Sequence, residues 1–202
     1  LQKYASLFGL NERTGIEIEE AAPQIANEFP VMAAIGQSNN NYTTVQLARY
    51  VTAVANEGTV YQYTLLNRLE DSDGNVLQTF EPQVRNQIDV LDTEEWNAIH
   101  SGMRMVVENT KEFDGFPIEA AGKTGTAQQN LKRPNHALFV GYAPYDDPEI
   151  SIATRIAYGY TSHNAAKLAR NVFAYYFNVE NEDELLNGQA ANGNSSSNEI
   201  SD

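Results

Sequence analysis

The residues Ala120–Gln128 read AAGKTGTAQ, and this is the chemically most distinctive stretch of the 202-residue chain. It contains Gly122-Lys123-Thr124, which is the ending of a phosphate-binding loop. It also contains Lys123-Thr124-Gly125-Thr126, which can line a serine acyl-transfer site. The two chemistries need different structures around the motif, so the flanking residues decide both fold and function.

A phosphate-binding loop requires a glycine five positions before Gly122, because successive backbone N–H groups have to wrap the phosphate. Pro117 occupies that position, and proline has no N–H and a fixed φ. Such a loop also opens a helix, whereas strand-forming residues follow here. The spacing excludes a phosphate-binding loop.

On a strand, the motif offers different chemistry. Side chains alternate between faces, so Lys123 cannot share a face with Thr124 in regular geometry. Gly125 allows a ligand or a second backbone to approach closely. The amine of Lys123, with the hydroxyl and N–H of Thr126, suits a substrate carboxylate beside a developing oxyanion. From these four residues alone, a strand with a solvated lysine is an equal alternative.

Working outward, capping boxes predict two helices, one starting at Thr43 with Gln46 and one at Asp92 with Glu95. Residues 11–41 resemble a loop. The predicted elements in chain order are a helix ending at Gly9, the helix from Thr43 to Gly58, a hairpin of strands 63–69 and 76–80 around Asp73-Gly74, the helix from Asp92, strands 136–142 and 150–158, and a helix over 164–177. The last helix is expected to have its apolar side at Leu168, Val172, Tyr175 and Tyr176. Neighbouring short strands with intervening helices predict an α/β fold of the α+β type, an antiparallel sheet flanked by helices.

The ends of the chain also carry information. It starts without Met, in residues with helical spacing, which predicts a chain cut from a larger protein. From residue 181 the sequence is polar and acidic. The expected organisation is therefore one domain portion over residues 1–180 and a disordered tail over 181–202.

Charge and composition exclude several functions. The chain has 13 Lys and Arg against 27 Asp and Glu, a formal net charge of −14, which repels nucleic acid and anionic membranes. The absence of cysteine removes disulfides, thiolate nucleophiles and cysteine-bound metals. His100, His136 and His163 lack metal-ligand spacing.

The segments Gly122–Gln128 and His136–Pro144 closely resemble the penicillin-binding transpeptidases, in particular the monofunctional (class B) enzymes. Ala34–Gln37, Thr43–Leu47 and Ala53–Val60 match the same family in the same order. The resemblance runs from the first helix to about residue 177. It implies the penicillin-binding/serine β-lactamase-like fold, of which this chain is the C-terminal portion.

The resemblance implies a function. In this family a serine attacks a D-Ala-D-Ala stem peptide, and the acyl group passes to an amine; β-lactams trap the acyl-enzyme. Lys123 then has an electrostatic and proton-network role, and Thr126 supplies a hydroxyl for the carboxylate and an oxyanion N–H. Thr124 and Gly125 shape the strand, and Gln128 faces the donor peptide. No cofactor or metal is implied.

The resemblance also implies partners and a location. The partners are stem peptides, β-lactams, the N-terminal part of the same domain, and membrane proteins of division or elongation. The location is the extracytoplasmic face of the bacterial cell membrane, with an anchor outside this chain.

Two of the family's three motifs are not recognised in the chain. Ser-x-x-Lys, which carries the nucleophile, does not occur. Ser38-Asn39-Asn40 fits Ser-x-Asn, but it follows Ile35–Gln37, where the family has an ordinary loop. We therefore expect the 202 residues alone to be inactive. The alternatives are a D,D-carboxypeptidase, a β-lactam sensor or β-lactamase-like protein, and a non-catalytic cell-wall scaffold of the same fold.

Overall fold

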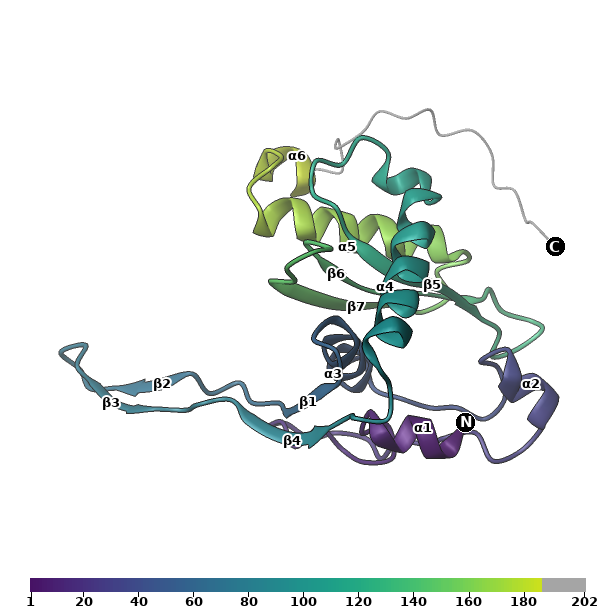
Figure 1. Cartoon of the computed structure of the whole chain (residues 1–202). Coiled ribbons are helices and arrows are strands. Elements are labelled where there is room, and N and C mark those ends of the chain that lie inside the picture. Colours follow the sequence, from purple (N-terminus) through teal and green to yellow (C-terminus); the bar gives the residue numbers. More distant parts are fainter. Residues whose placement is uncertain (187–202) are drawn as a thin grey trace.

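A computed structural model describes residues 1–186, in which helices pack around a three-stranded antiparallel sheet (Figure 1). The elements are α1 (Gln2–Leu7), α2 (Pro30–Ala34), α3 (Thr44–Ala55), β1 (Thr59–Gln62), β2 (Arg68–Glu70), β3 (Val76–Thr79), β4 (Gln83–Gln87), α4 (Thr93–Glu108), the 3-10 helix η1 (Lys111–Phe113), β5 (Ala121–Ala127), β6 (His136–Ala143), β7 (Ile150–Ile156), α5 (Ser162–Tyr176) and α6 (Glu182–Leu186). The predicted antiparallel sheet with flanking helices is confirmed. The disordered tail was predicted for residues 181–202; the structure describes α6 at its start, and residues 187–202 lie outside the described residues.

The central sheet has the order β5-β6-β7, so β5 is an outer strand. In the register, Lys123 pairs with Val140 and Phe139 with Thr154. Within residues 1–186 no strand pairs with the other edge of β5. The motif therefore lies on an open sheet edge.

The ring of Phe139 lies across a pair of glycines and fixes β5 against β6. Gly122 pairs with Gly141, and Phe139 is fully buried. A Cβ built on Gly122 would lie 2.3 Å from the Phe139 Cζ atom and 2.8 Å from the Val140 carbonyl oxygen. A Cβ on Gly141 would lie 2.6 Å from the Ala121 oxygen. Both positions therefore need glycine for close packing.

Helices cover both faces of the sheet (Figure 1). On one face, Phe139 packs in a cluster with Ala165, Ala169 and Phe173 of α5. On the other face, Tyr142 packs with Val51 of α3. α4 lies beside the start of β5, where the Arg104 Nη1 atom donates a hydrogen bond of 3.2 Å to the Ala120 oxygen. The motif strand is thus supported on three sides.

The predicted helix starts are confirmed. Both capping boxes form, Thr43 with Gln46 and Asp92 with Glu95. Each satisfies backbone N–H groups that have no partner within the helix. Trp96 of α4 is 3% exposed. None of the described helices is long and apolar enough to cross a membrane.

The predicted apolar side of α5 is wrong. Leu168, Val172, Tyr175 and Tyr176 are between 36% and 58% exposed. The buried residues are Ala165, Ala166, Ala169, Phe173 and Ala174. Small alanine side chains let the helix approach the sheet closely, so packing selects the alanine face over the more hydrophobic one.

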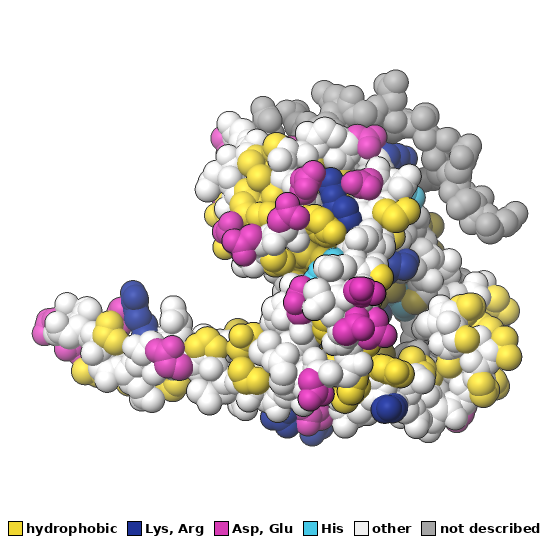
Figure 2. All heavy atoms as spheres, in the orientation of Figure 1, with side chains coloured by type: hydrophobic (Ala, Val, Ile, Leu, Met, Phe, Trp, Pro, Cys, Tyr) yellow, Lys and Arg dark blue, Asp and Glu magenta, His cyan; other side chains and the backbone are white. Residues whose placement is uncertain are grey.

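The predicted hairpin forms, but its strands differ from the expected ones. β2 pairs with β3, while residues 63–67 are not in a strand. β1 and β4, which were not predicted, pair antiparallel at the base. Together they form an arm that extends from the body (Figure 1), with hydrophobic side chains along it (Figure 2). Leu65, Leu69 and Leu77 on this arm are more than half exposed.

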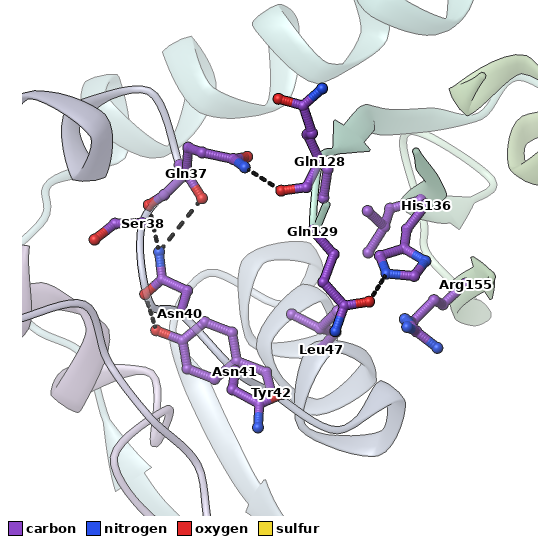
Figure 3. Close-up of a pocket in the computed structure, with 13 residues that line it drawn as sticks. Gln37, Ser38, Asn40, Asn41, Tyr42, Leu47, Gln128, Gln129, His136 and Arg155 are labelled. Atoms are coloured by element: carbon purple, nitrogen blue, oxygen red, sulfur yellow. Dashed lines mark hydrogen bonds between the residues drawn. The ribbon is translucent and has the colours of Figure 1, made fainter. Parts of the chain in front are cut away.

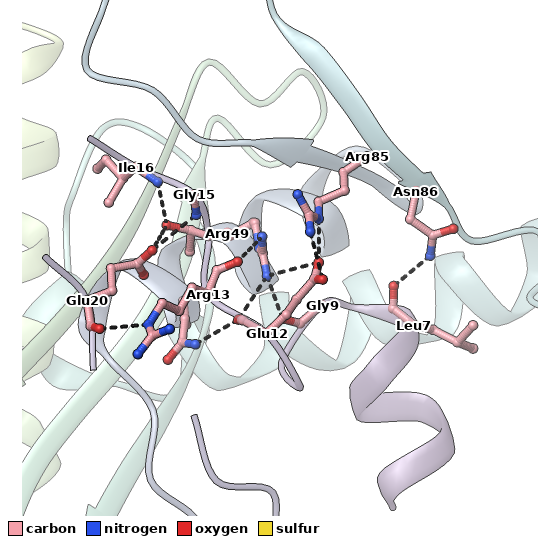
Figure 4. Close-up of polar contacts among 12 residues, drawn as sticks. Leu7, Gly9, Glu12, Arg13, Gly15, Ile16, Glu20, Arg49, Arg85 and Asn86 are labelled. Carbon is pink, nitrogen blue, oxygen red and sulfur yellow. Dashed lines mark hydrogen bonds and ion pairs between the residues drawn. The ribbon is translucent and has the colours of Figure 1, made fainter. Parts of the chain in front are cut away.

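Buried Arg49 on α3 holds the N-terminal segment (Figure 4). Its side chain is 1% exposed, and its guanidinium donates hydrogen bonds to the carbonyl oxygens of Gly9, Glu12 and Arg13. Arg85 forms an ion pair with Glu12. Within the region predicted as loop, this anchor orders residues 9–13 against α3, and the five-residue helix α2 begins at Pro30.

We predict that Gly122→Ala destabilises the protein by about 1–3 kcal/mol, because the added methyl group overlaps Phe139 and the Val140 backbone. Gly125→Ala is the matched control on the same strand, since its Cβ would meet only Leu138, at 3.5 Å. Urea unfolding measures both free energies of unfolding. Equal values for the two variants would contradict the proposed packing constraint.

Candidate functional site

The motif side chains lie at the open edge of β5. Lys123 and Thr126 are exposed, whereas Ala121 and Gly122 are buried. The Lys123 Nζ atom donates a hydrogen bond of 2.7 Å to the Thr124 carbonyl oxygen. The ammonium group is thereby held close to the strand backbone and remains accessible to a ligand.

Side-chain alternation along β5 places Lys123 and Thr126 on opposite faces of the sheet, and the register shows which face each one takes. Cross-strand partners share a face. Lys123 pairs with Val140, which packs on the α3 side, and Thr126 pairs with Ala137, which packs on the α5 side. The Thr126 hydroxyl oxygen accepts a hydrogen bond of 3.3 Å from the Ser162 N–H. A ligand touching both side chains therefore has to lie along the strand edge.

Gln128 follows directly after β5 and connects the motif to a distant loop. Its backbone oxygen accepts a hydrogen bond of 2.6 Å from the Gln37 Nε2 atom. Figure 3 shows this bond between the two segments. The structure thus brings together the segments around Gln37 and Gln128, both of which contributed to the family resemblance.

A pocket of about 430 Å³ lies beside this contact (Figure 3). Its wall is formed by Gly36, Gln37, Ser38, Asn40, Asn41, Tyr42, Leu47, Ala127, Gln128, Gln129, His136, Leu138 and Arg155. These residues come from the loop before α3, from α3, and from all three strands or the segments that follow them. The pocket could not be predicted from the sequence, because its parts are distant in the chain.

The Ser38-Asn39-Asn40 match lies in the pocket wall, and its side chains hold the loop together. The Ser38 hydroxyl donates to the Glu28 oxygen at 2.6 Å. The Asn40 Oδ1 atom accepts hydrogen bonds from the Ala26 N–H and the Tyr42 hydroxyl, at 2.8 and 3.0 Å. These contacts fit a structural role for this match.

His136 is 7% exposed and has a partner at each ring nitrogen. Its Nδ1 atom accepts a hydrogen bond of 3.1 Å from the Tyr158 N–H. The Nε2 atom therefore carries the hydrogen and donates to the Gln129 Oε1 atom at 3.0 Å. Burial, and next the nearby Arg155 charge, lower the pKa of His136 below its ordinary value. Geometry and charge both favour the neutral imidazole.

The connection between β7 and α5 is tied to the end of the motif strand. Tyr158 and Tyr160 have φ values of 55° and 64°, in the left-handed region. The Tyr160 N–H donates to the Asn135 oxygen at 3.1 Å, and Ser162 bonds Thr126. Tyr160 is 69% exposed. Strained non-glycine residues cluster at functional sites. The two tyrosines therefore support a functional site at this end of the sheet.

Over residues 1–186, no three His, Asp or Glu side chains are grouped so that they could hold a metal ion. His100 is half-buried, and its Nε2 atom lies 2.7 Å from the Val54 oxygen. His163 pairs with Glu112 at 2.8 Å. The three histidines therefore lie in separate surroundings.

Comparison with known proteins identifies the class. The family described as penicillin binding protein transpeptidase domain matches residues 1–174, and the chain belongs to this family. Peptidoglycan D,D-transpeptidase MrdA of Haemophilus influenzae is 32% identical over 214 residues, covering 88% of this chain and 32% of the relative. Penicillin-binding protein 2A of Bacillus subtilis is 27% identical, covering 95% of this chain and 30% of the relative. The chain thus spans about a third of these relatives.

Solved structures agree on the fold. Penicillin-binding protein 2B from Streptococcus pneumoniae superposes with a TM-score of 0.77 at 24% identity, covering 89% of this chain and 32% of that chain. A D,D-transpeptidase domain from Eggerthella lenta superposes with a TM-score of 0.76 at 23% identity, covering 88% and 47%. The resemblance to class B penicillin-binding proteins is confirmed.

We predict that His136 makes stability depend on pH. Because its native pKa is lowered, the unfolded chain binds a proton first as the pH falls through about 6.5, and the free energy of unfolding decreases. His136→Asn removes this titration, and its amide oxygen can replace the Nδ1 acceptor. Urea unfolding from about pH 8 to about pH 5 should show that the free energy of unfolding decreases less in the variant than in the wild type. Parallel curves for the two proteins would contradict the prediction.

Proposed function

We propose that the chain supplies the Lys-Thr-Gly strand of a serine D,D-transpeptidase that cross-links peptidoglycan stem peptides and is acylated by β-lactams. The observation that carries this proposal is the exposed Lys123–Thr126 motif on the open edge of β5. Support comes from the family match and from the D,D-transpeptidase relative. A related structure, penicillin-binding protein A of Mycobacterium tuberculosis, is an imipenem acyl-enzyme complex.

The proposed reaction has two acyl transfers. A serine hydroxyl attacks the carbonyl carbon between the two D-Ala residues, its proton passes to the leaving amine, and the last D-Ala departs. An amine of a second stem peptide then attacks the ester, which restores the serine. Ser-x-x-Lys is absent from the 202 residues. In this proposal the nucleophile comes from another part of the full-length protein, and these residues alone are inactive.

Each motif residue has a distinct role at the strand edge. The Thr126 hydroxyl accepts from Ser162, and its own hydrogen is free to donate to the carboxylate of the substrate or β-lactam. The Thr126 N–H is one oxyanion donor. The Lys123 ammonium contributes positive charge and proton exchange near the serine. Thr124 and Gly125 keep the edge narrow, and Gln128 faces the donor peptide.

The proposed setting follows from the same family membership. We place the protein on the extracytoplasmic face of the bacterial cell membrane, anchored by a segment outside this chain. Its partners are peptidoglycan stem peptides, β-lactams, the remainder of the same domain, and membrane proteins of division or elongation. One structural neighbour belongs to a peptidoglycan synthase complex that couples polymerization and crosslinking, which supports the last class.

Lys123→Ala in the full-length protein should lower the rate of acylation by labelled penicillin by about 10²–10³-fold, because a preorganised charge is removed from the transition state. Lys132→Ala is the control, since Lys132 is also exposed and lies outside β5. Unfolding curves confirm that both variants fold. Acylation of Lys123→Ala at nearly the normal rate would refute the assigned role.

Labelled penicillin should bind covalently to the full-length protein and not to residues 1–202 expressed alone, because the serine lies in the absent segment. Mass spectrometry of both proteins measures the adduct. A covalent adduct on the 202-residue chain would show that the nucleophile lies within it. Product analysis with an acceptor amine then separates a transpeptidase, which forms the amide, from a carboxypeptidase, which forms the acid.

A further inference from the structure

The pocket beside the motif has one charged end. Arg155 is the only lining residue with a permanent charge, and no Asp or Glu lines the wall. The Arg155 side chain forms no ion pair or hydrogen bond with any residue of the described range 1–186, while its backbone lies in β7 opposite Leu138. Arg13 and Arg133 also have no carboxylate partner within the described residues, but each bonds a neutral oxygen and neither lines the pocket. The Arg155 guanidinium is therefore the one lining the pocket that is available for an external anion.

The sheet connects this arginine to the motif. Gly125 pairs with Leu138, and Leu138 pairs with Arg155, so the three residues form one row across β5, β6 and β7. Two strand spacings separate the ends of the row, about 10 Å. Leu138 and Arg155 both line the pocket. A peptide of about three extended residues spans this distance.

The rest of the wall suits a peptide backbone. Gln37, Asn41, Gln128 and Gln129 carry side-chain amides, which both donate and accept hydrogen bonds. His136 is kept neutral by its two hydrogen bonds, so it adds no second cation. Figure 3 shows Arg155 and His136 on one side of the pocket and Gln37 on the other. The site is a neutral amide-lined channel ending in one cation.

We propose that this pocket is a subsite for the donor stem peptide, and that Arg155 pairs with a carboxylate carried by that peptide about three residues from the scissile bond. The inference rests on the proposed transpeptidase function. We assign the donor peptide to this pocket because one pocket wall is formed by Ala127, Gln128 and Gln129. These residues directly follow Thr126, the proposed contact of the substrate carboxylate. The ligand class is an anionic peptide.

The test uses two soluble donor peptides ending in D-Ala-D-Ala, which differ only in an internal carboxylate or carboxamide. In the full-length protein, the ratio of kcat/KM for the acid to that for the amide should be about 10 or more, the strength of a charge-assisted hydrogen bond. Arg155→Gln should bring the ratio to about 1 through KM, and Arg155→Lys should keep an intermediate ratio. The ratio does not depend on the fraction of folded enzyme.

Arg133→Gln is the matched control. Arg133 is also exposed and near the pocket, but it bonds the Tyr158 hydroxyl at 2.6 Å and does not line the pocket. This variant should keep the wild-type ratio. Equal ratios in wild type and Arg155→Gln would overturn the subsite, provided that labelled penicillin acylates the wild type. If labelled penicillin does not acylate the wild-type protein, the proposed function is refuted instead.

Discussion

The packing of Phe139 across Gly122 and Gly141 is the constraint on which the candidate site depends. The glycine pair brings β5 and β6 close under a buried ring and fixes their register. Side chains alternate along β5, so Lys123 and Thr126 lie on opposite faces, and the register sets Lys123 on the α3 side and Thr126 on the α5 side. The strand edge is therefore the place where one ligand reaches both. The alanine face of α5 supports the same ring from behind.

Features encoded by a few neighbouring residues could be predicted from the sequence. The capping boxes at Thr43 and Asp92 and the strands around the motif were confirmed, because local hydrogen bonds and alternation determine them. The buried side of α5 was wrong, because close packing on the sheet favours alanine over Leu168 and Tyr175. β1 and β4 were missed because they are short and mostly polar. The pocket and the His136 tautomer depend on contacts between distant segments, which a single sequence does not reveal.

The charged side chains of the site lie at the two ends of the proposed ligand path. The chain is strongly acidic, yet the ends of the proposed ligand path carry Lys123 and Arg155, and the pocket wall has no carboxylate. Between them lie amide side chains and a histidine held neutral by Tyr158 and Gln129. Such an arrangement favours a peptide with anionic groups over a phosphate, which the sequence around Pro117 excludes. It also agrees with membership in the penicillin-binding transpeptidase family.

The most direct test is a crystal structure of the full-length protein acylated by a β-lactam. We expect an acyl-serine facing the edge of β5, with the β-lactam carboxylate within hydrogen-bond distance of the Thr126 hydroxyl and the acyl carbonyl oxygen at the Thr126 N–H. The Lys123 ammonium should lie on the same side of the ligand as the serine. An acylated residue remote from β5, with no ligand contact to Lys123 or Thr126, would contradict the proposed role of this strand.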